Sequence, residues 1–391
     1  MGWPLLARAG FGLALILSGA ARARSVPAPA ATDAGEPAPI VIEPEAEPEQ
    51  GPAVSAEPEG GVITVPTVEV HAPPAAEPLD SASQRDPSGA LTVIHTSDFG
   101  GAAKDAAEVL STSTGVLVQD SGGYGQSKNV VVRGASPNGT LVLLDGIPLN
   151  GAGGIVDLSR VPLALVDRFE VLRGGAGARY GSGGLGGVVN VITRSPGAEP
   201  RVAGEATYGS WGTALGWLSA TGPVAGVDTL LLVHGGRSSG DFPFLFDPSP
   251  AFPGDEPVER RRTNNDARGT GGLLRLRHTW ASGYEVDLLG ELSFDDRGLA
   301  GTATNPLPDA RQSTGRVATS LRLSGELGGA RGSARAWFRR DRIGLSGGPQ
   351  AEQGAQAQRV GGVELEARKL LGGWQSLSAT LTVSGEDVTD A

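Results

Sequence analysis

The residue types that carry enzymatic or metal chemistry are sparse in this sequence. The 391-residue chain has no cysteine, which excludes disulfides, thiol nucleophiles and cysteine-based metal sites. Its four histidines, His71, His95, His234 and His278, stand at no metal-ligand spacing from one another. No nucleophile, base and orienting group form a recognisable set. We therefore expect no enzyme, no metal site and no resident cofactor.

Charge is distributed unevenly along the chain. The formal net charge is −11, and residues 25–84 hold eleven acids with no Lys or Arg, so the acidity belongs to that segment. No basic stripe indicates a nucleic-acid partner. The 61 glycines favour tight turns and close backbone approach over long helices.

The N-terminus predicts export. In residues 1–23, Arg8 is the only charge before an apolar run over 9–17, and small residues then offer cleavage after Ala21 or Ala23. The run is shorter than the ~20 apolar residues that a membrane-spanning helix needs. We interpret residues 1–23 as a signal peptide, the alternative being a buried N-terminal helix.

A linker and a short β-prone segment follow. Residues 24–61 are rich in Pro, Ala and Glu, and such a composition cannot offset chain entropy by burying apolar groups, so we expect a disordered, extended tether. Residues 62–72 are β-prone between Pro-rich borders. A single strand is unstable alone. It could pair with the sheet edge of another protein, or be a strand of the next domain, or have no role.

Residues 85–197 predict a compact α/β unit. A helix is expected after Asp98 as its N-cap, with Ala102, Ala106, Val109 and Leu110 on one face. A short helix or turn is expected at 161–166. Strands are expected near 91–94, 115–119, 129–134, 141–146, 168–174 and 186–193.

From residue 201 to residue 391 the pattern becomes a long alternation of apolar and polar residues. In 284–295, for example, Leu288 and Phe294 share one face while Asp287 and Glu291 share the other. Nine strands are predicted, near 201–208, 212–221, 227–235, 268–280, 284–295, 315–327, 332–342, 359–370 and 374–385. Short turns alternate with longer loops, apart from a short first loop. This favours a transmembrane β-barrel with a wet lumen over the alternative of a soluble sandwich.

The ordered motifs of the α/β unit resemble one family closely. Residues 141–149 (LVLLDGIPL), 166–174 (VDRFEVLRG) and 180–193 (YGSGGLGGVVNVIT), with Arg133-Gly134 upstream, are similar to the plug of TonB-dependent outer-membrane receptors of the cobalamin and siderophore type. Two positions depart from the family, which usually has Pro where Thr114 and Gly175 stand. The resemblance implies an α+β plug domain followed by an antiparallel transmembrane β-barrel of 22 strands, of which about nine are present.

The resemblance also implies partners and a location. The segment 62–72 takes the place of the TonB box, with the motif Thr67, Val68, Glu69, Val70, His71 and Ala72. The expected partners are the periplasmic domain of TonB, outer-membrane lipid, and a small metal chelate or cobalamin as ligand. The expected role is active uptake of such a nutrient, as a multi-pass protein of a Gram-negative outer membrane. The alternative is a surface adhesin or an inactive truncated relic.

Specific residues are candidates for a latch and for ligand contacts. Arg133 and Arg173 look like the plug arginines that pair with barrel carboxylates, the alternative being solvated strand ends. The ligand candidates lie in loops, where ordinary packing is the alternative: Tyr124, Ser136, Asn138, Asn150, and the aromatic residues Phe242 and Phe244 of the loop 236–267.

An odd number of strands leaves an open edge, which is costly in lipid because its backbone groups are unpaired. We therefore expect the chain to be a fragment or a truncated product. Pairing of the first of the nine strands with the ninth would contradict this expectation.

Overall fold

The computed structural model describes residues 10–18, 90–99, 105–151, 154–174, 184–247, 256–348, 354–371 and 375–390. The chain divides into two units, Met1–Gly19 with Glu77–Ala391, and Ala20–Ala76, and every described residue belongs to the first. The predicted linker and the segment 62–72 lie outside the described residues. Within the described ranges, no helix is both long and apolar enough to cross a membrane.

The first part of the fold is an α/β unit spanning residues 90–193. Its strands are β2 (Ala90–His95), β3 (Val116–Asp120), β4 (Lys128–Val132), β5 (Thr140–Leu144), β6 (Ile147–Pro148), β7 (Val166–Arg173) and β8 (Gly187–Thr193). Its helices are α2 (Ala106–Ser111) and the 3₁₀ turns η1 (Thr96–Phe99), η2 (Pro137–Gly139), η3 (Leu158–Arg160) and η4 (Leu163–Leu165). These positions agree with the strands predicted from sequence.

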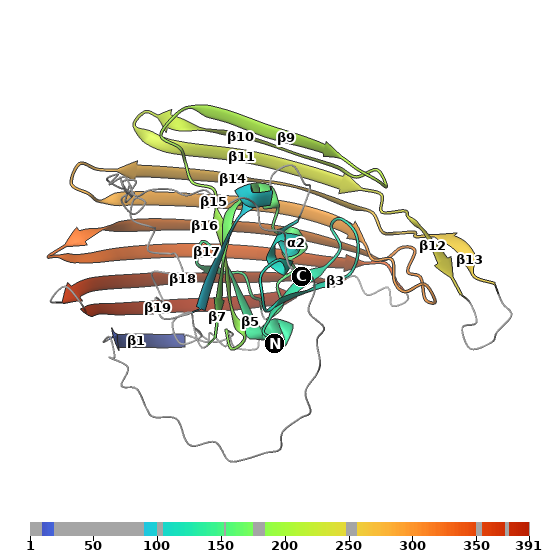
Figure 1. The fold of residues 1–391 in the computed structure, drawn as a ribbon, viewed down its shortest axis with the longest axis horizontal. Coiled ribbons are helices and arrows are strands. Elements are labelled where there is room, and N and C mark those ends of the chain that lie inside the picture. Colours follow the sequence, from blue (N-terminus) through green and yellow to red (C-terminus); the bar gives the residue numbers. More distant parts are fainter. Residues whose placement is uncertain are drawn as a thin grey trace, which may run out of the picture. The chain divides into compact units, whose positions relative to one another are not determined.

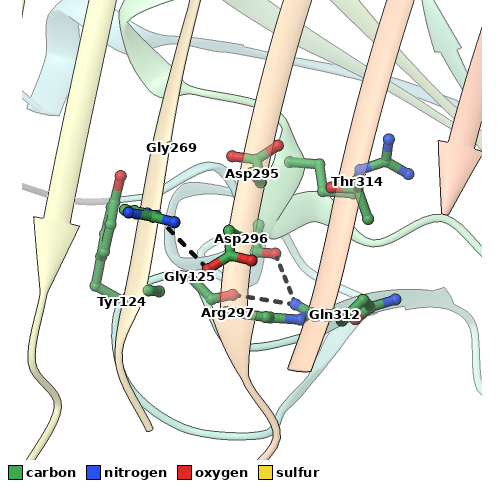
Figure 2. Close-up of a pocket in the computed structure, with 12 residues that line it drawn as sticks. Tyr124, Gly125, Gly269, Asp295, Asp296, Arg297, Gln312 and Thr314 are labelled. Carbon is green, nitrogen blue, oxygen red and sulfur yellow. Dashed lines mark hydrogen bonds and ion pairs between the residues drawn. The ribbon is translucent and has the colours of Figure 1, made fainter. Parts of the chain in front are cut away.

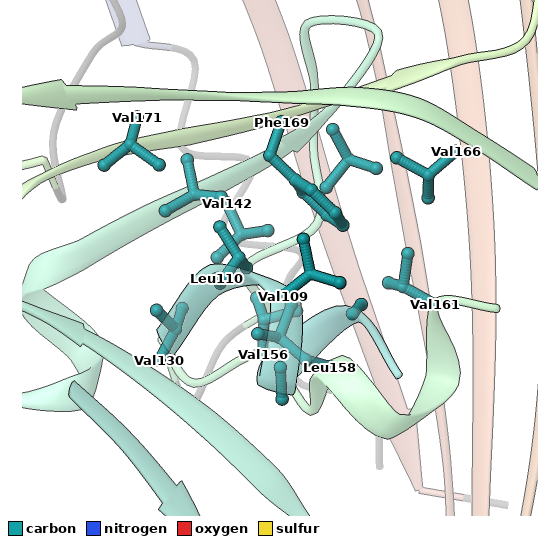
Figure 3. Close-up of a cluster of buried hydrophobic side chains, with 14 of the residues drawn as sticks. Val109, Leu110, Val130, Val142, Val156, Leu158, Val161, Val166, Phe169 and Val171 are labelled. Atoms are coloured by element: carbon teal, nitrogen blue, oxygen red, sulfur yellow. The ribbon is translucent and has the colours of Figure 1, made fainter. Parts of the chain in front are cut away.

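The α/β unit has its own hydrophobic core. Five strands form one sheet in the order β2-β7-β8-β5-β6, parallel between β5 and β8 and antiparallel elsewhere, and β3 pairs with β4 separately. Val142 of β5, Phe169 of β7 and Val109 of α2 are buried in one cluster (Figure 3). Leu141, Leu172 and Val188 form a smaller cluster. Because strand side chains alternate, these two clusters occupy opposite faces of the sheet.

Helix α2 begins later than the sequence suggested. Its N-cap is Asp105, whose carboxylate accepts a hydrogen bond from the backbone N–H of Glu108 at 2.9 Å. Asp98, the predicted N-cap, instead lies in η1. Asp98 and Asp105 both precede the apolar residues of the helix, and either could serve as its N-cap. The prediction of Asp98 was wrong because the sequence spacing does not show which of the two caps the helix.

The second part is a long antiparallel sheet (Figure 1). Its strands from residue 201 onward are β9 (Arg201–Tyr208), β10 (Ala214–Val224), β11 (Val227–Ser238), β14 (Ala267–Thr279), β15 (Glu285–Gly298), β16 (Arg311–Leu327), β17 (Ala330–Ser346), β18 (Gly354–Leu371) and β19 (Gln375–Asp390). Each pairs with its neighbour in sequence order. All nine fall where alternation predicted them, and a hairpin of β12 (Pro243–Phe246) and β13 (Val258–Arg261) extends the connection between β11 and β14.

The two faces of the long sheet differ in chemistry. Side chains of one face, called here the inward face, contact the α/β unit and include buried Arg275, Arg335 and Arg339. The opposite, outward face exposes large apolar side chains: Leu218, Leu231, Val233, Leu274, Leu292, Phe294, Val317, Leu321, Phe338, Val363 and Leu365. A polar inward face and an apolar outward face are typical of a barrel in lipid.

The long sheet has two different rims, and its strands β9 and β19 do not pair to close it into a barrel. Strands β11, β15 and β17 end at the rim with the longer connections, called here the long-loop rim, and short turns join strands at the other, short-turn rim. β9 and β19 are not paired with each other. β19 instead pairs antiparallel with β1 (Gly10–Ser18), which lies within the predicted signal peptide. This pairing leaves the prediction of an export signal untested.

Candidate functional site

The candidate site is the contact between the α/β unit and the inward face of the long sheet, and two arginines of β17 hold one part of it. Arg335 donates to the backbone carbonyls of Asp145 and Gly146, and also to the carboxylate of Glu364 at 2.9 Å. Arg339 donates to the carbonyls of Pro148 and Asn150. Strand alternation places both guanidinium groups on the same face of β17. Arg335 therefore binds the turn between β5 and β6, and Arg339 binds β6 and the loop that follows it.

That turn has the conformation its sequence demands. Asp145 and Gly146 both have positive φ, 45° and 81°, as a two-residue hairpin of the I′ type requires. A Cβ on Gly146 would lie 2.6 Å from a guanidinium nitrogen of Arg335. Glycine is therefore needed here both for the turn and for the approach of the arginine.

The side chain of Asp145 makes a second connection to the long sheet. Its carboxylate accepts from the backbone N–H of Thr193 at 3.2 Å and from the Thr193 hydroxyl at 2.7 Å. Arg275 of β14 lies 3.7 Å from this carboxylate, donates to the Thr193 hydroxyl at 3.2 Å, and pairs with Asp287 at 3.0 Å. Asp145, which follows β5, thus contacts both Thr193 of β8 and Arg275 of β14. Arg275 in turn connects this group to Asp287 of β15.

A third group of contacts lies nearer the long-loop rim. Arg297 of β15 pairs with Asp157 at 2.8 Å and donates to the carbonyl of Gly125 at 3.0 Å. Arg316 of β16 donates to the carbonyl of Arg160 at 2.7 Å, and Arg160 pairs with Asp341 at 3.4 Å. Burial, and then the nearby Arg316, lower the pKa of Arg160, although its carboxylate neighbours oppose the shift.

Beside these contacts lies a small pocket that is partly open to solvent. The α/β unit contributes Tyr124, Gly125, Ser159 and Arg160, and the rest of the lining comes from β14, β15 and β16 near the long-loop rim, including Asp295 and Arg297 (Figure 2). Burial, and then the charge of Asp295, raise the pKa of Tyr124 to about 12. A neutral phenol among both signs of charge suits a polar ligand held by hydrogen bonds and offers no nucleophile.

The structure does not place the predicted latch arginines against the long sheet. Arg173 donates to the hydroxyl of Ser113 at 2.7 Å, within the α/β unit. Arg133 has left-handed backbone and an exposed side chain. Among the described residues, neither pairs with a carboxylate of the long sheet. The latch role of Arg133 and Arg173 stays a prediction; the contacts that the structure describes run instead from guanidinium groups of the long sheet to carbonyls and carboxylates of the α/β unit.

The predicted ligand residues have different surroundings. Tyr124 lines the pocket, whereas Ser136 and Asn138 are exposed beside η2. The amide of Asn150 is used internally, since it accepts from Val142 N–H at 2.7 Å and donates to the carbonyls of Thr140 and Gly154 at 2.9 and 2.7 Å. It is therefore a structural group of the loop.

The two aromatic candidates lie in and next to the β12–β13 hairpin. Phe242 and Phe244 meet edge to face, with ring centroids 6.4 Å apart. The guanidinium of Arg260 on β13 stands 4.0 Å above the ring of Phe246. The hairpin is thus a self-packed aromatic element at the long-loop rim.

The residues that sequence reasoning missed are the inward arginines of the long sheet: Arg275, Arg297, Arg316, Arg335 and Arg339. Their signal was a charged residue at an inward position of an alternating strand, because such a charge demands a partner. The partners themselves are mostly backbone carbonyls, which no sequence pattern marks. No group of His, Asp or Glu able to hold a metal occurs among the described residues.

Comparison with known proteins accords with this geometry. Residues 83–188 match the model of the TonB-dependent Receptor Plug Domain. The Vitamin B12 transporter BtuB of Vibrio vulnificus (strain CMCP6) is 42% identical over 93 residues, 24% of this chain and 15% of the relative. BtuB of Vibrio cholerae serotype O1 (strain ATCC 39541 / Classical Ogawa 395 / O395) is 41% identical over 109 residues, 28% of this chain and 18% of the relative.

Solved structures share the fold beyond the α/β unit. The ferric citrate transporter FecA in its unliganded form superposes with a TM-score of 0.63 at 21% identity, over 77% of this chain and 48% of that one. The siderophore receptor PirA from Acinetobacter baumannii gives 0.61 at 19% identity, over 79% and 49%. This chain thus spans about half the length of those receptors and a smaller part of the curated relatives.

Residues 83–188 of this chain thus match a plug domain, and the long sheet shares the fold of part of these solved receptors. We call the α/β unit the plug from here on.

Proposed function

We propose that this chain is the plug-bearing part of an outer-membrane receptor that takes up a scarce nutrient with energy supplied through TonB. The observation that carries the proposal is the seating of the plug. Polar contacts from β14 to β17 hold it, and the pocket beside Tyr124 lies near the long-loop rim. Such contacts can be exchanged for water when the plug shifts, so the plug can both block and open a path.

The ligand class is proposed from the relatives. The plug is similar to that of proteins named Vitamin B12 transporter, and the fold is similar to that of proteins named as receptors for ferric citrate and siderophores. We propose a ligand of this kind, a cobalamin or an iron–siderophore complex.

The expected partner on the other side of the membrane is the periplasmic domain of TonB. Residues 62–72 would add a strand to a sheet edge of that domain, and backbone hydrogen bonds would supply the affinity. Residues 24–61 would give this segment reach. Residues 1–23 would direct export, which N-terminal sequencing of the mature protein checks by cleavage after Ala21 or Ala23.

A peptide spanning residues 62–72 tests the proposal directly. We expect it to bind the purified periplasmic domain of TonB in a fluorescence-anisotropy titration. A matched peptide with Val68→Pro and Val70→Pro should bind at least tenfold more weakly, because proline removes the donors of a paired strand. Equal binding of both peptides, or of neither, would contradict TonB coupling and favour a non-transporting surface protein.

A further inference from the structure

The outward face of β17 and β18 carries an arginine cluster whose charge is not balanced. Arg340 and Arg342 of β17 and Arg359 of β18 are exposed. Their neighbours Arg339 and Val360 face inward, since Arg339 reaches the plug and Val360 packs with plug residue Ile147. Alternation therefore places these three arginines on the outward face.

Within this cluster, Arg340 and Arg359 stand directly opposite each other across the strand pair. Like charges in that position repel, and their Cβ atoms are only ~5 Å apart in an antiparallel pair. Asp387 lies 3.8 Å from Arg359, while among the described residues Arg340 and Arg342 have no acidic partner. Three guanidinium groups thus share one carboxylate.

Two other outward arginines near the same rim have acidic partners, whereas Arg237 of β11, opposite Arg268, has none among the described residues. Arg268 of β14 pairs with Asp296 at 3.6 Å, and Arg311 of β16 pairs with Asp266 at 2.9 Å. The cluster on β17 and β18 differs because three exposed guanidinium groups gather there around one carboxylate, which leaves charge for an anion from outside the chain to balance.

The height of the cluster indicates which anion. On β18 the outward residues between Arg359 and Lys369 are uncharged: Gly361, Val363, Leu365 and Ala367. Lys369 pairs with Ala330 at the start of β17, ten residues before Arg340. Ten strand residues at a tilt of 35–45° rise about 25 Å, which is the height of the apolar band of an outer-membrane barrel. The cluster therefore lies where hydrocarbon gives way to headgroups.

We propose that Arg340, Arg342 and Arg359 bind the phosphate of a lipid headgroup in the outer leaflet. Guanidinium groups bind phosphate oxygens in pairs of parallel hydrogen bonds, and a phosphate between Arg340 and Arg359 turns their repulsion into attraction. The exposed ring of Phe338, one outward position below Arg340, contacts the acyl chains. The site rests on the proposed membrane location and is independent of the transported ligand.

The test measures lipid binding by the full chain purified in detergent, with native mass spectrometry as readout. Bisphosphorylated lipid A, its dephosphorylated form and inorganic phosphate are the probes. We expect wild-type protein to retain the bisphosphorylated lipid at least tenfold more strongly than the dephosphorylated form. The triple variant Arg340→Gln/Arg342→Gln/Arg359→Gln should lose that preference, and Lys369→Gln, at the opposite rim of the same face, should keep it.

Equal binding of the two lipids by wild-type protein would overturn the proposal even if the triple variant did not fold. Equal loss in the Lys369→Gln control would also overturn it, as would displacement of the lipid by millimolar inorganic phosphate. Nutrient uptake measured on the same variants separates the two proposals. A lipid-binding failure with intact uptake rejects this site alone, and loss of TonB-peptide binding rejects the uptake role alone.

Discussion

The phenol oxygen of Tyr124, in a loop of the plug, lies so close to Gly236 of β11 that a Cβ at this position would clash with it. The same missing atom would also meet the side chain of Leu215 on β10. The absence of a side chain at position 236 therefore lets the plug loop pack against the long sheet. The pocket that Tyr124 lines lies beside this contact.

Gly236→Ala should disturb this fit. The added methyl group cannot be placed without moving the Tyr124 ring, and overpacking of this kind costs about 1–3 kcal/mol in free energy of unfolding. Denaturant titration of the full chain in detergent micelles measures the change. Tyr124→Ala combined with Gly236→Ala should recover part of it, because the ring that is displaced is then absent.

The matched control for this change is Gly290→Ala in β15. Nothing lies within 4 Å of a Cβ built on Gly290, so its replacement should leave the free energy of unfolding within about 0.5 kcal/mol of wild type. Equal losses at both positions would show that the effect belongs to strand glycines in general.

Removing the guanidinium of Arg335 should loosen the turn at Asp145. Arg335→Met deletes the donors to two plug carbonyls and the buried ion-pair partner of Glu364, and removing one member of such a pair typically costs about 3–5 kcal/mol. Limited proteolysis should then cleave the plug faster. The double variant Arg335→Met/Glu364→Met should recover most of the unfolding free energy but not the protection of the turn.

In an alkaline titration, Tyr124 should lose its proton at a higher pH than an ordinary tyrosine does. Its pKa is raised to about 12 in the folded chain against 10.0 for an unperturbed tyrosine. Because the folded state holds the proton more tightly, this tyrosine contributes stability that is complete below pH 10 and is lost between about pH 10 and pH 12. Absorbance at 295 nm, compared between wild type and Tyr124→Phe, isolates its titration. A midpoint near pH 10 in the folded protein would contradict its burial.

Substitutions of Asn150, Ser136 and Asn138 should distinguish a structural role in the plug loops from direct contact with a ligand. Asn150→Ala breaks three internal hydrogen bonds and should destabilise the plug by about 1–3 kcal/mol. Ser136→Ala and Asn138→Ala change exposed side chains and should leave stability within about 0.5 kcal/mol. Any loss of ligand affinity in the latter two, measured by isothermal titration, would then report direct contact.

The long strands could be predicted because alternation is a local signal. Leu288 and Asp287 already assign the two faces of β15, and the structure agrees. The start of α2 was missed because Asp98 and Asp105 offer the same capping chemistry.

The site itself was harder to predict because its partners are distant in sequence and lack side-chain signals. Arg335 binds carbonyls of residues about 190 positions earlier. The family resemblance drew attention to Arg133 and Arg173 in the plug, whereas the described contacts run from arginines of the sheet to the plug backbone. Only the folded arrangement shows which strand meets which turn.

The separation of the plug core from its contacts with the long sheet has a calorimetric consequence. The large apolar cluster belongs to the plug alone, while the apolar contacts to the sheet involve single plug side chains such as Leu165 and Ile147. Exposing apolar surface raises the heat capacity, and exposing polar surface lowers it. Lifting the intact plug off the sheet should therefore change the heat capacity far less than unfolding it, so the enthalpy of that movement should vary little with temperature.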